Sequence, residues 1–176
     1  MFEKQSSINH VELKGQTDPV TDIVIILHVL AAILFLGPVT VATSSFHVRA
    51  VDAHNGDTRA AGAAHNLYKI SQTYGVLSLL VPLLGLAIMF LDTGYYFTQY
   101  NFHAAIVLSV LAWAILLFLV MPRQRKMMGA LGLLEADEQA AETFEITDWK
   151  KAKSQLSMFG GIWALLWVLT AITMFL

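Results

Sequence analysis

Residues 102–122 decide the fold class of the chain, and they read FHAAIVLSVLAWAILLFLVMP. The segment contains no Asp, Glu, Lys or Arg. A helix needs about 20 predominantly apolar residues to cross the hydrocarbon core of a bilayer. The length and composition of this segment therefore predict a transmembrane helix, because a surface helix of a soluble domain would carry a polar face.

Three further charge-free segments lie at 23–48, 70–91 and 154–176. Charged residues make up 14% of the 176-residue chain, against about a quarter in a soluble domain, and they cluster between the four segments. We therefore expect an all-α, polytopic membrane protein with a single membrane domain over 1–176, folded as a four-transmembrane-helix bundle. The first segment is too long for a cleavable signal peptide and follows the tail 1–22, so we expect it to remain in the mature protein.

Basic residues are concentrated in two of the connections. Three lie between the first and second segments and six between the third and fourth, which makes nine of the eleven Lys and Arg: Arg49, Arg59, Lys69, Arg123, Arg125, Lys126, Lys150, Lys151 and Lys153. Cytoplasmic loops carry an excess of Lys and Arg. The prediction is a multi-pass protein of the plasma membrane with both termini outside the cytoplasm.

The connections have their own expected structure. The cytoplasmic loop over 123–153 starts basic and turns acidic, which predicts an extension of the third helix followed by a short cytoplasmic surface helix. Thr147 and Asp148 are placed to cap the N-terminus of the fourth helix. The connection from Asp92 to Phe102 is rich in Tyr and Phe, and aromatic residues of this kind suit the headgroup interface.

Small residues predict where the helices pack against one another. Helices in lipid associate through close van der Waals contact, which small side chains permit. Stripes of such residues run along the second and fourth segments, and Gly37-Pro38 predicts a kink in the first. The expected helix-packing positions are Gly75, Ser78, Pro82, Gly85, Gly160, Gly161 and Ala164.

Several functional classes are disfavoured by what the chain lacks. The four segments hold no ionisable acid or base apart from histidine, whereas proton relays and ion pathways require such groups. Cysteine is absent, and the sequence contains no recognised catalytic motif. We expect no enzymatic activity of its own, no cofactor and no metal. The net charge of −2 gives no argument for nucleic acid as a partner.

Histidine is the one remaining residue type whose side chain could bind a haem or a metal ion. His28 and His103 both lie near the outer ends of their helices, so a small b-type haem protein with these two axial ligands is the alternative function. Against it, His103 stands about 200 degrees around the helix from Ala105, away from the small-residue face. A hydrogen-bonded packing role for His28 and an interfacial role for His103 are favoured, while a contact with a quinone or a lipid headgroup, or a role facing another subunit, stays open. A weaker metal-site hypothesis joins the histidines of the first inner connection to a nearby acid: His47, His54, His65, Asp52 and Asp57.

Three tryptophans lie at mid-span, away from the interfaces that Trp prefers. They are Trp113, Trp163 and Trp167. Lipid exposure is one explanation. The sharper prediction is an outward face that binds a larger membrane protein, because buried aromatic rings dominate many interfaces.

The first span also carries a resemblance. Leu27-His28-Val29-Leu30-Ala31-Ala32-Ile33-Leu34-Phe35-Leu36-Gly37-Pro38 resembles the opening helix of a family of uncharacterised bacterial four-helix integral membrane proteins. In length and layout the whole chain resembles the small four-helix accessory membrane subunit of the fused complex III and complex IV respiratory supercomplex of actinobacteria. The resemblance implies a non-catalytic accessory, assembly or stabilising subunit, surrounded by lipids and bound to a quinol-oxidising, oxygen-reducing complex.

Overall fold

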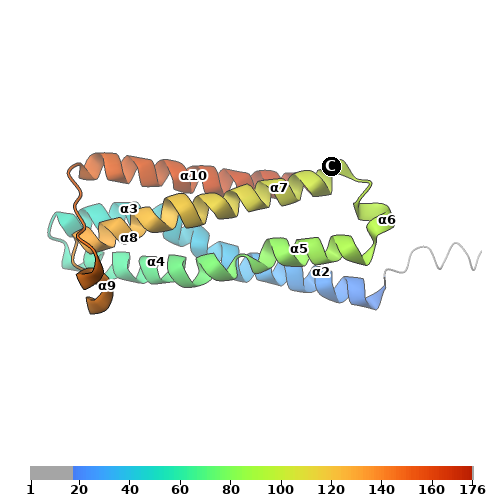
Figure 1. Ribbon diagram of the computed structural model, residues 1–176, viewed down its shortest axis with the longest axis horizontal. Coiled ribbons are helices and arrows are strands. Elements are labelled where there is room, and N and C mark those ends of the chain that lie inside the picture. Colours follow the sequence, from blue (N-terminus) through green and yellow to red (C-terminus); the bar gives the residue numbers. More distant parts are fainter. Residues whose placement is uncertain (1–17, 176) are drawn as a thin grey trace, which may run out of the picture.

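Four long helices run antiparallel, side by side, in the computed structural model, which describes residues 18–175 (Figure 1). The described residues contain no strand. The long helices cover Pro19–His54, Thr58–Leu91, Tyr100–Ala130 and Trp149–Thr173, and each is long and apolar enough to cross a membrane. The protein is therefore an all-α, multi-pass membrane protein with a four-helix bundle, as the charge-free segments predict.

The long helices are interrupted and extend beyond the apolar segments. Asp18, Asp57 and Asp148 cap helix N-termini with their side chains, so the helices continue into the polar ends. The elements are α2 (Pro19–Ala31), η1 (Ala32–Leu36), α3 (Gly37–His54), α4 (Thr58–Leu77), α5 (Leu80–Leu91), α7 (Tyr100–Ile115), η2 (Leu116–Val120), α8 (Met121–Ala130) and α10 (Trp149–Thr173). Two short helices close the ends of the bundle: α6 (Thr93–Tyr96) and α9 (Ala136–Ala141).

Each interruption lies just before a proline. The π-helical segments η1 and η2 precede Pro38 and Pro122, and the break between α4 and α5 precedes Pro82. Proline lacks an N–H, and its ring collides with the carbonyl four residues earlier, so a regular helix cannot continue through it. At Pro82 the carbonyl of Ser78 accepts a hydrogen bond from the Val81 N–H at 3.1 Å instead. The kink predicted at Gly37-Pro38 falls directly after the π-helical segment η1, which ends at Leu36.

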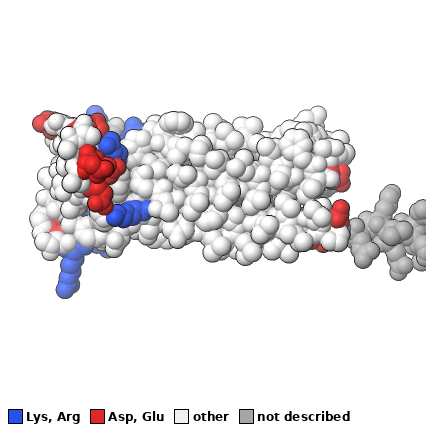
Figure 2. All heavy atoms as spheres, turned by 60° about the horizontal axis from the view of Figure 1, so that its bottom comes forward, with Lys and Arg blue, Asp and Glu red and all other residues white. Residues whose placement is uncertain are grey.

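Charge separates the two ends of the bundle, here called the α6 end and the α9 end. Lys and Arg gather at the α9 end together with Asp and Glu, the charged atoms visible at the α6 end are acidic, and the visible surface between the two ends is uncharged (Figure 2). Large apolar side chains cover that middle surface, among them Ile33 and Phe118 at 64% and 72% exposure. A surface of this kind is stable where lipid covers it.

The main core occupies the half of the bundle toward the α9 end. Its fully buried large side chains include Phe46, Leu116, Met127, Leu156 and Trp163. In this half α3 packs along α4, and α10 packs on α3. No residue of α2 or α5 belongs to the core cluster of the described chain. Toward the α6 end, α2 packs mainly on α5 and α7 mainly on α10, with few contacts between the two pairs.

Candidate functional site

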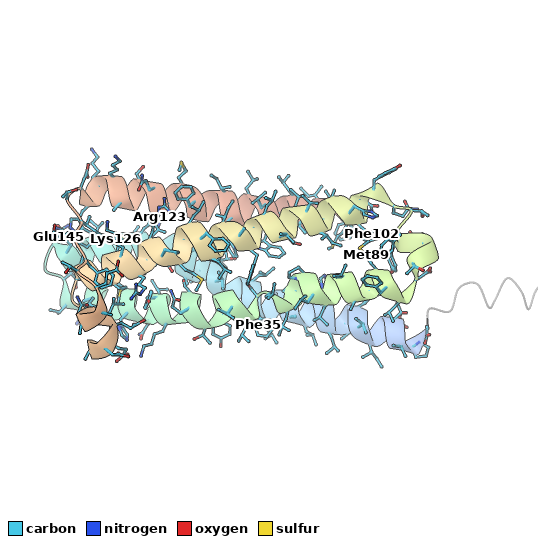
Figure 3. The ribbon with its side chains drawn as sticks, viewed as in Figure 1. Phe35, Met89, Phe102, Arg123, Lys126 and Glu145 are labelled. Carbon is cyan, nitrogen blue, oxygen red and sulfur yellow. The ribbon has the colours of Figure 1, made fainter. Side chains whose placement is uncertain are left out.

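A cavity of about 160 Å³ lies where the two helix pairs separate. All four long helices line it, through residues of α2, η1, α5, α7 and α10. Met89 of α5 and Phe102 of α7 lie close together in this region (Figure 3). The cavity exists because several lining residues have little or no side-chain volume: Ala32, Gly85, Ala105 and Ala171.

His28 is the most polar group of the wall. Its ring Nδ1 lies 3.0 Å from the carbonyl oxygen of Val81 on α5, so it links the two helices of one pair. A Cβ atom built on Gly85 would lie 3.3 Å from His28 Cε1. The absence of a side chain at Gly85 therefore gives the imidazole its space beside α5.

Two hydroxyl groups and the indole nitrogen of Trp167 are the other polar side-chain groups of the lining residues. Ser109 donates a hydrogen bond from Oγ to the carbonyl of Ile106 at 2.9 Å, and Thr170 donates from Oγ1 to that of Leu166 at 2.8 Å. Both hydrogens are thus engaged within their own helices, as is common for Ser and Thr in helices. Each hydroxyl oxygen keeps lone pairs that can accept a hydrogen bond.

The second predicted haem ligand does not line this cavity. His103 lies exposed on α7, with Nδ1 3.1 Å from the carbonyl oxygen of Gln99 in the preceding turn. Its ring stands edge-on to Phe97, with centroids 5.9 Å apart. The structure therefore does not place His28 and His103 around one common space.

The other histidines among residues 18–175 also lie apart. His54 stacks on Trp149 with ring centroids 4.2 Å apart, His65 Nδ1 lies 3.2 Å from the carbonyl oxygen of Leu133, and His47 is buried in α3. Over residues 18–175 no group of three or more His, Asp or Glu is arranged to hold a metal ion. Asp52 pairs with Arg49 at 3.6 Å, and Asp57 caps α4.

The small residues of the second long helix lie at helix contacts. A Cβ atom built on Gly75 would lie 3.3 Å from Met121 Sδ and 3.4 Å from Leu116 Cδ2. Ser78 is 1% exposed, and its hydroxyl donates to the carbonyl of Gly75. Pro82 and Gly85 line the cavity. In this stripe Gly75 and Ser78 therefore lie at helix contacts, whereas Pro82 and Gly85 lie at the cavity.

The fourth long helix requires two corrections. Gly161 is exposed and has nothing within 4 Å of a Cβ built on it, whereas Gly160 approaches the Thr43 carbonyl oxygen at 3.3 Å. The predicted close approach at Gly161 is therefore wrong. Trp163 is 1% exposed, so its predicted place on an outward, partner-binding face is also wrong.

The physical reason for both corrections is the composition of the buried stripe on α10. Leu156, Gly160, Trp163, Trp167 and Thr170 follow one another at alternating spacings of four and three residues, and they are buried or half-buried. Glycine allows α3 to approach, and the large indole one turn later fills the wider space beyond. Trp167 lines the cavity, Trp113 is half-buried on α7, and Ala164 is half-buried beside the stripe.

Comparisons with protein family models, curated proteins and solved structures gave no match. The fold and the cavity define the class of protein: a four-helix, multi-pass membrane protein with an apolar cavity inside the bundle.

Proposed function

We propose that the protein is a non-catalytic accessory subunit of a larger membrane complex. Following the resemblance of the chain, that complex is a quinol-oxidising, oxygen-reducing respiratory assembly of the plasma membrane. The lack of Asp, Glu, Lys and Arg in the charge-free segments supports a role without ion or proton transfer through the bundle.

The observation that carries this proposal is the packing of α2. Of its thirteen residues, only Ala31 is buried. Large apolar side chains point outward around the helix, including Ile23 and Ile26 at 58% and 57% exposure. Helices in lipid gain stability from close contact with other helices, so a helix with so little contact in its own bundle is suited to pack against a partner.

Purification from native membranes in mild detergent tests the proposal. The Ile26→Trp substitution places a bulky ring on the free face of α2. Leu165→Trp is the matched control on α10, because Leu165 is similarly exposed at 56%. We expect wild type and Leu165→Trp to co-purify with a large complex that shows cytochrome absorbance, and Ile26→Trp to lose most of it. Equal partner retention by both variants would contradict the proposed surface.

An absorbance spectrum separates this proposal from the haem alternative. The chain isolated from its complex in stronger detergent is expected to show no Soret band. A Soret band that disappears in a His28→Phe variant would favour electron transfer by the chain itself.

The proposed orientation places the α9 end in the cytoplasm, because the described Lys and Arg gather there. The chain has no cysteine, so a single introduced thiol gives an unambiguous label. Tyr100→Cys at the α6 end is expected to react with an impermeant thiol reagent in intact cells, and Asp137→Cys in α9 only after lysis. The opposite labelling pattern would reverse the orientation.

A further inference from the structure

We propose that the cavity binds the hydroxylated six-membered ring of a membrane-soluble molecule, a phenol or a hydroquinone, through a hydrogen bond donated by the ligand. The proposal combines three properties of the cavity: its size, its apolar wall and the hydrogen-bonding character of its few polar groups. Ligand binding of this kind does not depend on the partner proposed above.

The hydrogen bond to Val81 defines the state of the His28 ring. A carbonyl oxygen only accepts, so Nδ1, at 3.0 Å from it, carries the hydrogen. No carboxylate of the described residues lines the cavity, and an unpaired charge in an apolar wall is costly. The ring is therefore neutral, and its other nitrogen, Nε2, is a hydrogen-bond acceptor.

The remaining polar groups of the wall have the same character. The hydroxyl hydrogens of Ser109 and Thr170 are donated to backbone carbonyls, which leaves their oxygens as acceptors. Among the lining side chains, the indole Nε1 of Trp167 is the one donor without a hydrogen-bond partner, and this nitrogen is buried away from the accessible surface. The cavity thus offers acceptors to a ligand, and a ligand that brings a donor satisfies them.

The volume indicates a single ring. An apolar cavity of about 150 Å³ is known to hold benzene, and this cavity measures about 160 Å³. The rings of Phe102 and Trp167 belong to its wall and offer flat surfaces for an aromatic ligand. The cavity is partly open, so an apolar tail on the ring can extend out of it.

The hydrogen-bond acceptors of the wall distinguish between the two redox forms of one ring, the hydroquinone and the quinone. A hydroquinone donates through its hydroxyl groups, whereas the corresponding quinone carries only acceptors and would face the acceptors of the wall. A buried acceptor without a donor costs free energy. The cavity is therefore expected to prefer the hydroquinone over the quinone of the same carbon skeleton.

Calorimetric titration of the purified full chain in lipid nanodiscs tests the proposal, with empty nanodiscs as the blank for partitioning into lipid. The three probes are methylhydroquinone under anaerobic reducing conditions, methylbenzoquinone and toluene. We expect methylhydroquinone to bind at least about tenfold more tightly than either other probe, which corresponds to about 1.4 kcal/mol. Equal binding of methylhydroquinone and toluene, tighter binding of the quinone, or no binding at all would overturn the proposal.

Two variants locate the site. His28→Phe keeps a ring and removes the acceptor, so the preference for methylhydroquinone should disappear. Ala105→Leu fills the cavity from α7 and leaves the bond from His28 to Val81 in place, so binding of every probe should be lost. His103→Phe is the matched control, because this histidine is exposed on the same helix as Ala105, and it should bind like wild type. Wild-type binding by a folded Ala105→Leu variant would place the ligand elsewhere and overturn the proposal.

Discussion

The two halves of the bundle use the same four helices in different ways. Toward the α9 end, α3, α4, α8 and α10 enclose large buried side chains in a continuous core. Toward the α6 end, the pairs α2–α5 and α7–α10 separate around a cavity. Close packing in this protein is therefore concentrated in one half of the bundle, and the other half contains a cavity.

The largest expected effect is in the packed half. Trp163→Ala removes a side chain that is 1% exposed and leaves a void in the core, which should lower the free energy of unfolding by about 3 to 5 kcal/mol. Thermal unfolding in detergent measures the loss. The control is Leu165→Ala on the outward side of α10, which should be close to wild type. A Trp163→Ala protein as stable as this control would mean that the core of the α9 half is not where the stability lies.

The neighbouring glycines of α10 give a second comparison. Gly160→Leu places a side chain against the backbone of α3, since a Cβ there would lie 3.3 Å from the Thr43 carbonyl oxygen. Overpacking of this kind should cost about 1 to 3 kcal/mol. Gly161→Leu meets open space and should not destabilise the fold. Unfolding curves that coincide for the two variants would contradict the described packing of α10 on α3.

The smallest effect is expected in the cavity half. A Cβ on Gly85 would also lie 3.3 Å from its nearest neighbour, but that neighbour is the His28 side chain beside a cavity rather than a backbone carbonyl. The imidazole can shift, so Gly85→Ala should change the free energy of unfolding by less than about 1 kcal/mol, with alanine's better helix propensity offsetting part of the contact. A loss as large as that of Gly160→Leu would show that the cavity half is as tightly packed as the core.

Sequence reasoning predicted the four helices because the bilayer imposes length and apolarity on every crossing segment. It also predicted the cap at Asp148, since capping depends on neighbouring residues alone. It could not predict which face of α10 points to the core, because in lipid both the core face and the outer face are apolar. The sequence pattern therefore does not show which of Gly160 and Gly161 is buried, or whether Trp163 lies on the core face or the outer face.

The cavity was beyond sequence reasoning for a different reason. The cavity arises because small side chains on several helices face the same space, and the sequence of any single helix does not show this. His28 was recognised as a hydrogen-bonded candidate, but its partner, the Val81 carbonyl, is a backbone group 53 residues away. The alternating spacing from Leu156 to Thr170 did not indicate the buried position of Trp163 either, because the neighbouring stripe from Ser157 to Ala171 has the same spacing and is largely exposed.

The interruptions before Pro38 and Pro82 have a mechanical consequence. Phe35 in η1 and Tyr74 near the end of α4 have ring centroids 6.4 Å apart, so the two neighbouring helices are broken at similar depth. Two adjacent breaks can act as a hinge, because regular helix on either side can tilt without losing its own hydrogen bonds. Bending there would swing α2 and α5 together, tied by the bond from His28 to Val81, and would change the width of the cavity. We therefore expect the cavity to respond to bilayer thickness and lateral pressure while the α9 half keeps its shape.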